Sequence, residues 1–317
     1  MNCLCCGKPL KENKYEIGWH KACIKRFFGT SVIPEIEVDD ETVKLLADET
    51  TNKGYTVPGV QKKLSLHLMS GGGQKPRLTL VIYPTGYILK PQVEDYTALP
   101  EAEQLVMSMA EATGISTVPH ALVKGENSYA YITKRVDRQF HKNDVKMLAM
   151  EDFCQLDLRL TQDKYKGSYE RCAKIISRYS SRKGLDMSEL FLRLVFCFVT
   201  GNSDMHLKNF SLIETDEGSY KFILSPAYDL LPVNVIMPED KEQFALTMNG
   251  KKQNLHKKDF LIFAEGCGLT RIQAENMIKK VVSMKTKYIE MTKESLIPDE
   301  MKASMIALIN RRLAVFE

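Results

Sequence analysis

A dense run of polar residues lies in the middle of the chain, in the string GNSDMHLKN at positions 201–209. Asp204 and Asn209 stand in the register D-x-x-x-x-N, and Asp229 follows further along the chain. A carboxylate in such a loop can orient a substrate hydroxyl, while amide and carboxylate oxygens are the ligands that Mg²⁺ prefers. The spacing therefore predicts a loop for phosphoryl transfer, with Asp204 facing the hydroxyl and Asn209 and Asp229 on the metal.

The residues on either side of this string predict that it is held by core elements. The apolar run 190–199 predicts a buried helix before it, and 210–213 and 220–224 predict two short strands after it. Catalytic groups are commonly found in loops held in this way. Protein kinases use the same register, followed by a metal-binding Asp. D-x-x-x-x-N alone is common by chance, but the whole string with the second Asp is much less so.

A lysine and a glutamate earlier in the chain have the placement of a second functional pair. Lys90 ends an expected strand at 86–90, and Glu103 lies in an expected helix at 99–110. A strand lysine paired with a helix glutamate steadies the α- and β-phosphates of ATP in kinases. Each residue taken singly is better explained as a solvated surface charge, and Glu101 is a rival for Glu103. The string at 201–209 favours the functional interpretation.

The segment 54–68 predicts a phosphate-binding tip. Pro58 and Gly59 form a turn with Gln61, Lys62 and Lys63 close by, and the alternation from Lys63 onward predicts a half-buried strand. Such a tip could lay backbone amides and a cation over nucleotide phosphates. The alternative is an ordinary turn between strands, which is what a Pro-Gly pair usually makes.

Four of the eight cysteines lie in the first 23 residues. Cys3 and Cys6 form one close pair, and His20 and Cys23 form another after 13 residues, with Cys5 left over. Two such pairs suit a tetrahedral Zn²⁺ site with four protein ligands, which would be structural. So short a segment has too little core to fold unaided, so the metal would supply its stability. The alternative is a set of free thiols near the terminus.

The remaining patterns predict the domain organisation. Strand patterns at 77–83, 86–90, 121–123 and 128–133 end at 134–138, where the chain is expected to cross between two lobes. Beyond this point helical patterns dominate, and Thr270 with Gln273 forms a capping box that predicts a helix start. We therefore expect an α+β fold with a zinc module at 1–33, a β-rich N-lobe with the phosphate loop at 34–136, and a helical C-lobe at 137–317.

The totals exclude several classes of protein. Lys and Arg number 44 against 40 Asp and Glu, a net charge of +4 that is too balanced to indicate a nucleic-acid binder. No apolar run is long enough to cross a bilayer, and no secretory signal opens the chain. We therefore expect a cytoplasmic protein with no membrane partner, whose cysteines are thiols or metal ligands.

With these pieces in order, the chain resembles the HipA-like serine/threonine kinase toxins of bacterial toxin–antitoxin systems. The resemblance spans residues 54–317 and implies a two-lobed kinase fold with an all-helical C-lobe and Mg-ATP as the phosphoryl donor. It rests on the strings TVPGVQKK at 56–63, ILKP at 88–91, RVDR at 135–138, EDFCQ at 151–155, GNSDMHLKNF at 201–210 and SPAYDLL at 225–231.

The resemblance also implies roles for single residues. Asp204 looks like the catalytic base, Asn209 and Asp229 like the Mg²⁺ ligands, and Lys90 with Glu103 like the phosphate lysine and its partner. Lys208 could neutralise phosphate charge, and His206 is either catalytic or structural. The other residues expected to contact ATP are the phosphate-loop residues Thr56, Val57, Gly59, Gln61 and Lys63 and the hinge residues Lys134 and Val136. Thr56 stands where the family carries an autophosphorylated Ser.

One departure from the family pattern concerns the N-terminus. Longer members carry an extra subdomain of about a hundred residues ahead of the phosphate loop, an ordinary size for such a unit. Here the Cys/His module takes its place, as in short, split members whose missing piece can be a separate small protein. The family's usual partner is a helix-turn-helix antitoxin, and its targets include aminoacyl-tRNA synthetases.

Together these features predict an ATP-dependent kinase that phosphorylates a Ser or Thr of a cellular protein and its own Thr56. A small-molecule kinase of the same fold is an alternative, because the same site accepts any well-placed hydroxyl. A pseudokinase adaptor that only binds a transcriptional antitoxin is a third hypothesis. The complete set of Lys90, Asp204, Asn209 and Asp229 argues against it.

Overall fold

The computed structural model describes residues 1–12, 16–36, 63–69, 75–79, 85–125, 128–141 and 144–317. The chain folds into two compact units. Unit 1 comprises Met1–Gln104 and Val118–Val136, and unit 2 comprises Leu105–Thr117 and Asp137–Glu317. Among the described residues, no helix combines the length and the apolar character that crossing a bilayer requires.

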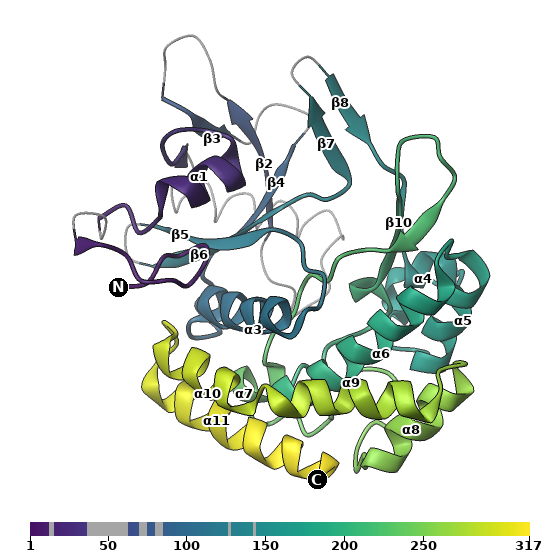
Figure 1. Cartoon of the computed structure of the whole chain (residues 1–317). Helices are drawn as coiled ribbons and strands as arrows, with labels where there is room; N and C mark the ends of the chain where they lie inside the picture. Colours follow the sequence, from purple (N-terminus) through teal and green to yellow (C-terminus); the bar gives the residue numbers. More distant parts are fainter. Residues whose placement is uncertain (13–15, 37–62, 70–74, 80–84, 126–127, 142–143) are drawn as a thin grey trace. The chain divides into compact units, whose positions relative to one another are not determined.

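Unit 1 is built on a six-stranded sheet with the order β1-β3-β2-β4-β6-β5. Neighbouring strands are antiparallel except β1 and β3, which are parallel. The helix α1 and the sheet are visible in Figure 1. The elements are α1 (Lys21–Phe28), β1 (Glu35–Ile36), β2 (Leu64–Met69), β3 (Arg77–Thr79), β4 (Tyr87–Lys90), β5 (His120–Lys124) and β6 (Tyr129–Lys134).

The alternation predicted from Lys63 onward is present in β2. In β2, Leu64 and Leu66 are buried while Ser65 between them is exposed, the pattern of a strand with one face on a core. The register places Lys90 opposite Tyr131 and Tyr87 opposite Lys134. The strand expected at 86–90 is confirmed as β4. The tip at 56–62 lies outside the described residues.

The helix α3 (Leu99–Thr113) covers the stretch expected to be helical at 99–110. Its residues up to Gln104 belong to unit 1, and those from Leu105 onward belong to unit 2. Ala102, Val106, Met109 and Ala110 have no exposed surface. Their spacing of three and four residues gives the helix one fully buried stripe.

Unit 2 is mainly helical and also contains two small sheets. One sheet has the order β11-β10-β9 and the other pairs β7 with β8. The strands are β7 (Arg138–His141), β8 (Asp144–Met147), β9 (Met150–Asp152), β10 (Ser211–Glu214) and β11 (Phe222–Leu224). The helices are α4 (Phe153–Leu156), α5 (Tyr169–Tyr179), α6 (Lys183–Thr200), α7 (Val233–Ile236), α8 (Lys257–Gly266), α9 (Arg271–Ser283), α10 (Lys285–Glu294) and α11 (Asp299–Leu313), with short 3₁₀ turns η2 (Thr161–Asp163), η3 (Leu207–Asn209) and η4 (Ala314–Phe316).

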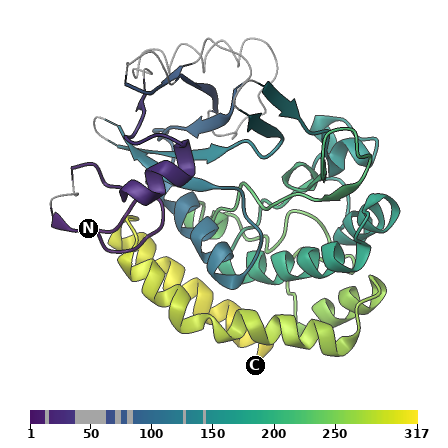
Figure 2. The same ribbon diagram turned by 45° about the horizontal axis from the view of Figure 1, so that its top comes forward.

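The helix α6 forms the centre of unit 2. Every residue from Leu190 to Thr200 is buried, as the apolar run at 190–199 predicted. Its neighbours include α5, α9 and α11, and Figure 2 shows α11 and the other C-terminal helices in yellow-green. The predicted capping box is also confirmed, because Thr270 accepts from the amide of Gln273 at the start of α9.

Candidate active site

The string at 201–209 forms the loop between α6 and β10. Gly201 ends α6 with φ at +71°, a left-handed conformation that favours glycine. A Cβ at this position would clash with the side chain of Leu308 in α11. The backbone turn at the end of the helix therefore requires glycine at this position. The short turn η3 then connects the loop to β10.

Asp204 is half-buried in this loop and is held by hydrogen bonds. The hydroxyl of Tyr165 donates to Asp204 Oδ1 at 2.7 Å, and the Asp204 amide donates to Asn202 Oδ1 at 3.3 Å. Burial raises the pKa of the Asp204 carboxyl above its usual range, and the charges of Asp229 and Asp240 raise it further. The Tyr165 hydrogen bond and the charge of Lys164 act in the opposite direction. The result is an oriented carboxylate with a raised pKa, the property expected of a base.

The side chain of Asn209 is buried and is held by a hydrogen bond within its own loop. Its amide nitrogen donates to the Asp204 carbonyl oxygen at 2.9 Å. Because the nitrogen must face this acceptor, the amide oxygen lies on the other side of the group, where it could bind a cation. The same hydrogen bond ties the two ends of the D-x-x-x-x-N register together.

Asp229 is half-buried and lies close enough to Asp204 to raise its pKa through charge repulsion. Its φ of +57° is a left-handed conformation that non-glycine residues seldom adopt, and such residues often occur at functional sites. The neighbouring Tyr228 donates to the Lys208 carbonyl at 3.1 Å and lies 2.5 Å from the Ser211 hydroxyl. The structure therefore joins the segment of Asp229 to the loop of Asp204 and Asn209.

Lys208 and His206 contact different neighbours. Lys208 forms an ion pair with Asp152 at 2.6 Å, and Asp152 in turn caps the start of α4. His206 is buried, and its ring meets that of Tyr165 edge-on at 5.1 Å between centroids. Their catalytic roles stay predictions, and both side chains also brace the loop.

A partly buried polar network supports the loop through Ser203. Ser203 donates to Asp240 Oδ2 at 2.6 Å, and the Asn234 amide donates to Ser203 at 3.3 Å. Arg312 of α11 donates to Asn234 Oδ1 at 3.0 Å and lies 4.7 Å from the Phe198 ring. No sequence pattern marks Tyr165, Asn234 or Arg312, because each meets the loop through tertiary packing alone.

In unit 1, Lys90 forms a buried ion pair with Glu103. The Nζ–Oε1 distance is 2.5 Å, and the two side chains are 4% and 0% exposed. Lys90 also lies 5.2 Å from the centre of the Tyr131 ring. The structure thus pairs Lys90 with Glu103 and not with Glu101, whose carboxyl has a pKa raised by burial.

The residues expected to contact adenine and phosphates are only partly described. Lys134 closes β6, and burial lowers its pKa. Val136 is the last residue of unit 1, and Lys63 stands exposed just before β2. Thr56, Val57, Gly59 and Gln61 lie outside the described residues.

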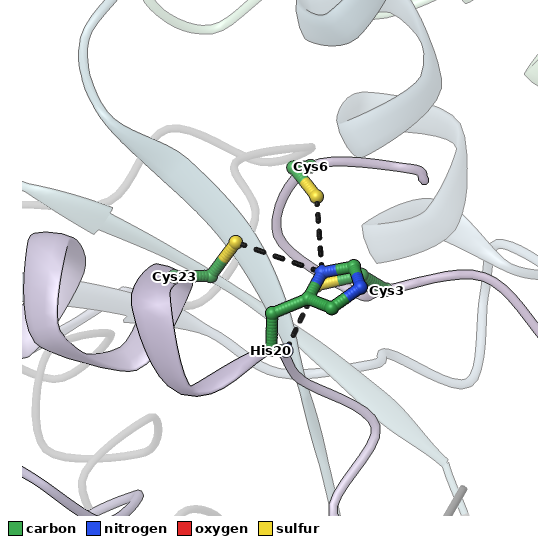
Figure 3. A group of neighbouring side chains, drawn as sticks. All are labelled: Cys3, Cys6, His20 and Cys23. Atoms are coloured by element: carbon green, nitrogen blue, oxygen red, sulfur yellow. Dashed lines mark hydrogen bonds between the residues drawn. The ribbon is translucent and has the colours of Figure 1, made fainter. Parts of the chain in front are cut away.

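The four residues expected to bind zinc come together at the N-terminus. The candidate ligand atoms of Cys3, Cys6, His20 and Cys23, which we call the Cys/His cluster, all lie within 4.8 Å of one another. Figure 3 shows the three sulfur atoms around the His20 ring. This donor set could hold a metal ion.

The chain is similar to a known protein family and to several proteins named as kinases. Residues 55–288 match the model of the HipA-like C-terminal domain. A Haemophilus influenzae protein that carries the name "Putative kinase" is 24% identical, over 97% of this chain and 95% of its own. Y4mE and Y4dM of Sinorhizobium fredii, which carry the same description, are 28% and 32% identical and cover 76% and 65% of this chain.

Two solved structures share the fold. HipA of Shewanella oneidensis, solved with HipB and its operator DNA, matches with a TM-score of 0.67 and 21% identity over 83% of this chain. The Helicobacter pylori proinflammatory kinase CtkA matches with a TM-score of 0.54 and 14% identity over 80% of it. The chain spans 94% of CtkA but 64% of HipA, and only 59% of Y4mE and 52% of Y4dM. The two TM-scores show that this chain has the α+β fold of these kinase-like proteins.

Proposed function

The chain belongs to the family of the HipA-like C-terminal domain, and from this premise we propose that it is an ATP-dependent kinase that phosphorylates a serine or threonine of a protein. The observation that carries the proposal is the bond from the Asn209 amide to the Asp204 carbonyl. It joins the Asn209 side chain to the backbone of Asp204, so one loop presents both an amide oxygen and a carboxylate with a raised pKa. Kinase chemistry needs these two groups in this register.

The proposed cofactors are ATP and Mg²⁺. Asn209 and Asp229 would hold the cation, which spreads the charge of the γ-phosphoryl group in the transition state. Lys90, oriented by Glu103, would bind the α- and β-phosphates. Lys134 and Val136 would meet adenine through their backbone groups, and the phosphate loop with Thr56, Val57, Gly59, Gln61 and Lys63 would cover the phosphates. We also assign a structural Zn²⁺ to the Cys/His cluster.

Asp204 would act as the base that orients the acceptor hydroxyl. Its hydrogen bond from Tyr165 keeps one carboxylate oxygen in place, so the group needs no reorganisation when the hydroxyl arrives. Lys208 could neutralise charge on the transferred group, and His206 would stabilise the loop.

We further propose that the kinase works in a type II toxin–antitoxin system. The support is the fold shared with HipA of Shewanella oneidensis, a protein solved with HipB and operator DNA. The partners would be a helix-turn-helix antitoxin and a separate small subunit. Thr56 would be an autophosphorylation site, and an aminoacyl-tRNA synthetase is a candidate target.

The test is phosphate transfer from labelled ATP in a lysate of the host cell and to the protein itself. Asp204→Asn should abolish transfer while the circular dichroism spectrum stays unchanged. Asp216→Asn, in the exposed turn after β10, is the matched control and should remain active. Transfer that persists in Asp204→Asn would contradict the assignment of the base. Label found only in a soluble small molecule would instead support the small-molecule kinase.

A further inference from the structure

The Cys/His cluster has the dimensions of a zinc site. His20 Nδ1 lies 3.5 Å from Cys6 Sγ and 3.9 Å from Cys23 Sγ. With Zn–N of about 2.0 Å and Zn–S of about 2.3 Å, a tetrahedral ion separates its nitrogen and sulfur ligands by about 3.5 Å. The three sulfur atoms and one ring nitrogen are therefore spaced as if around a common centre, which Figure 3 makes visible.

The orientation of the His20 ring also indicates metal binding. His20 Nε2 lies 3.1 Å from the Pro9 carbonyl oxygen, an acceptor that only an N–H can approach. The hydrogen is therefore on Nε2, and the lone pair of Nδ1 faces the sulfur atoms. A histidine that binds a metal through one nitrogen commonly donates the other N–H to a carbonyl in this way.

The sulfur of Cys3 also accepts a hydrogen bond from the backbone. The His20 amide donates to Cys3 Sγ at 3.4 Å. Cys5 differs, because its sulfur is not among the four ligand atoms that lie within 4.8 Å of one another, and it accepts a long contact of 4.0 Å from Arg26. Cys5 is therefore not part of the cluster and offers a matched control.

The residues beside the ligands contact the edge of the sheet in unit 1. Among the described residues, β5 is the last strand in the sheet order, so one of its edges pairs with no strand there. The Leu122 amide of β5 donates to the Leu4 carbonyl at 2.9 Å, and the indole of Trp19 donates to the Leu122 carbonyl at 3.1 Å. Leu4 lies between Cys3 and Cys6, and Trp19 directly precedes His20. The two residues that cover the strand edge are thus held by neighbours that belong to the cluster.

A set of packed aromatic side chains links Trp19 to β4. Trp19 is 1% exposed and packs on Phe27 and Phe28 of α1, with ring centroids 5.6 and 5.4 Å away. Both phenylalanines contact Tyr87, whose hydroxyl donates to the Phe27 carbonyl at 3.3 Å. Tyr87 begins the strand that ends at Lys90. Cys23 lies on α1 with Phe27 and Phe28. The Cys/His cluster therefore joins the Cys3–Cys6 loop to the helix that carries the two phenylalanines.

We propose that Zn²⁺ bound by Cys3, Cys6, His20 and Cys23 fastens the N-terminal module (residues 1–33) to the open edge of β5, so that the packing of Trp19 in unit 1 depends on the metal. The ion replaces a hydrophobic core that so short a segment cannot build. It also covers a strand edge that would otherwise be open to pairing with another chain.

Metal content provides the first test. The untagged protein should contain about one zinc per chain by elemental analysis, the stoichiometry of one four-ligand site. Cys23→Ser should lose the metal, and Cys5→Ser should retain it. A wild-type protein without zinc, or a Cys5→Ser variant that loses it as fully as Cys23→Ser, would overturn the assignment.

Fluorescence provides the second test, and it needs no variant that must fold. Trp19 is the single tryptophan of the chain, so its emission reports on this contact alone. Removal of zinc from the wild-type protein by a strong chelator should shift the emission to longer wavelength, and added Zn²⁺ should reverse the shift. If zinc leaves and the emission does not move, the metal does not fasten the module. Asp204→Asn should give the same result as wild type, so the outcome is independent of kinase activity.

Discussion

At the scale of single residues, opposing effects set the pKa of Asp204. Burial and the charges of Asp229 and Asp240 raise it, while the hydrogen bond from Tyr165 and the charge of Lys164 restrain the rise. A base must be ionised to accept the hydroxyl proton, so a raised pKa limits activity from the acid side. Activity is therefore expected to fall as the pH falls through this pKa.

Tyr165→Phe should move this acid limit to higher pH. The hydroxyl stabilises the charged form of Asp204, so its loss raises the pKa further. In a profile of kcat/KM against pH, which reports on the free enzyme, the acid limb should shift upward while the value at high pH changes less. Tyr179→Phe, an exposed tyrosine of α5, is the control and should leave the profile in place. An acid limb that stays put or moves to lower pH would contradict the assignment.

At the scale of elements, the junction between α6 and the catalytic loop depends on one glycine. Gly201 combines a left-handed backbone with close contact to Leu308 of α11. The network from Arg312 through Asn234 to Ser203 reaches the same loop from the same helix. The C-terminal helix therefore determines where the loop begins.

Gly201→Ala should lower the free energy of unfolding by about 2–4 kcal/mol, because left-handed strain and overpacking add. The measurement is urea denaturation followed by circular dichroism. Gly184→Ala in the same helix is the matched control, since a Cβ there meets no atom within 4 Å. It should be neutral or stabilise by up to about 1 kcal/mol, because alanine is the better helix former. Equal effects at both positions would refute the argument from Leu308.

At the scale of the whole molecule, the proposed reaction requires groups from both units. Lys90 and Glu103 belong to unit 1, while Asp204, Asn209 and Asp229 belong to unit 2. Binding of Mg-ATP is therefore expected to depend on residues of each unit.

Mg-ATP should raise the melting temperature of the wild-type protein. At a hundred times the dissociation constant, the stabilisation amounts to about 2.7 kcal/mol. Lys90→Met and Asp229→Ala should each abolish most of the shift, while Lys166→Ala, which removes an exposed lysine, should keep it. The measurement is a thermal-shift titration with Mg-ATP. A full shift in Asp229→Ala would exclude its role as a metal ligand, whatever the outcome for Lys90.

The sequence by itself determined the features that depend on local spacing. The register of Asp204 and Asn209, the two ligand pairs of the Cys/His cluster and the apolar run of α6 all lie within short stretches. Alternation and helical periodicity follow from backbone geometry, which is why β2, β4, α3 and α6 appear where their patterns predict. The family resemblance rests on the same local strings.

Only the tertiary structure decided which distant groups meet. Glu101 and Glu103 are two positions apart on α3 and so point about 200° apart around its axis. In the folded chain it is Glu103 that forms the ion pair with Lys90 of β4. Tyr165 reaches Asp204, Arg312 reaches Asn234, and Trp19 reaches β5 across long stretches of chain. Spacing along a chain specifies which chemical groups a segment presents, whereas their partners depend on how the segments pack together.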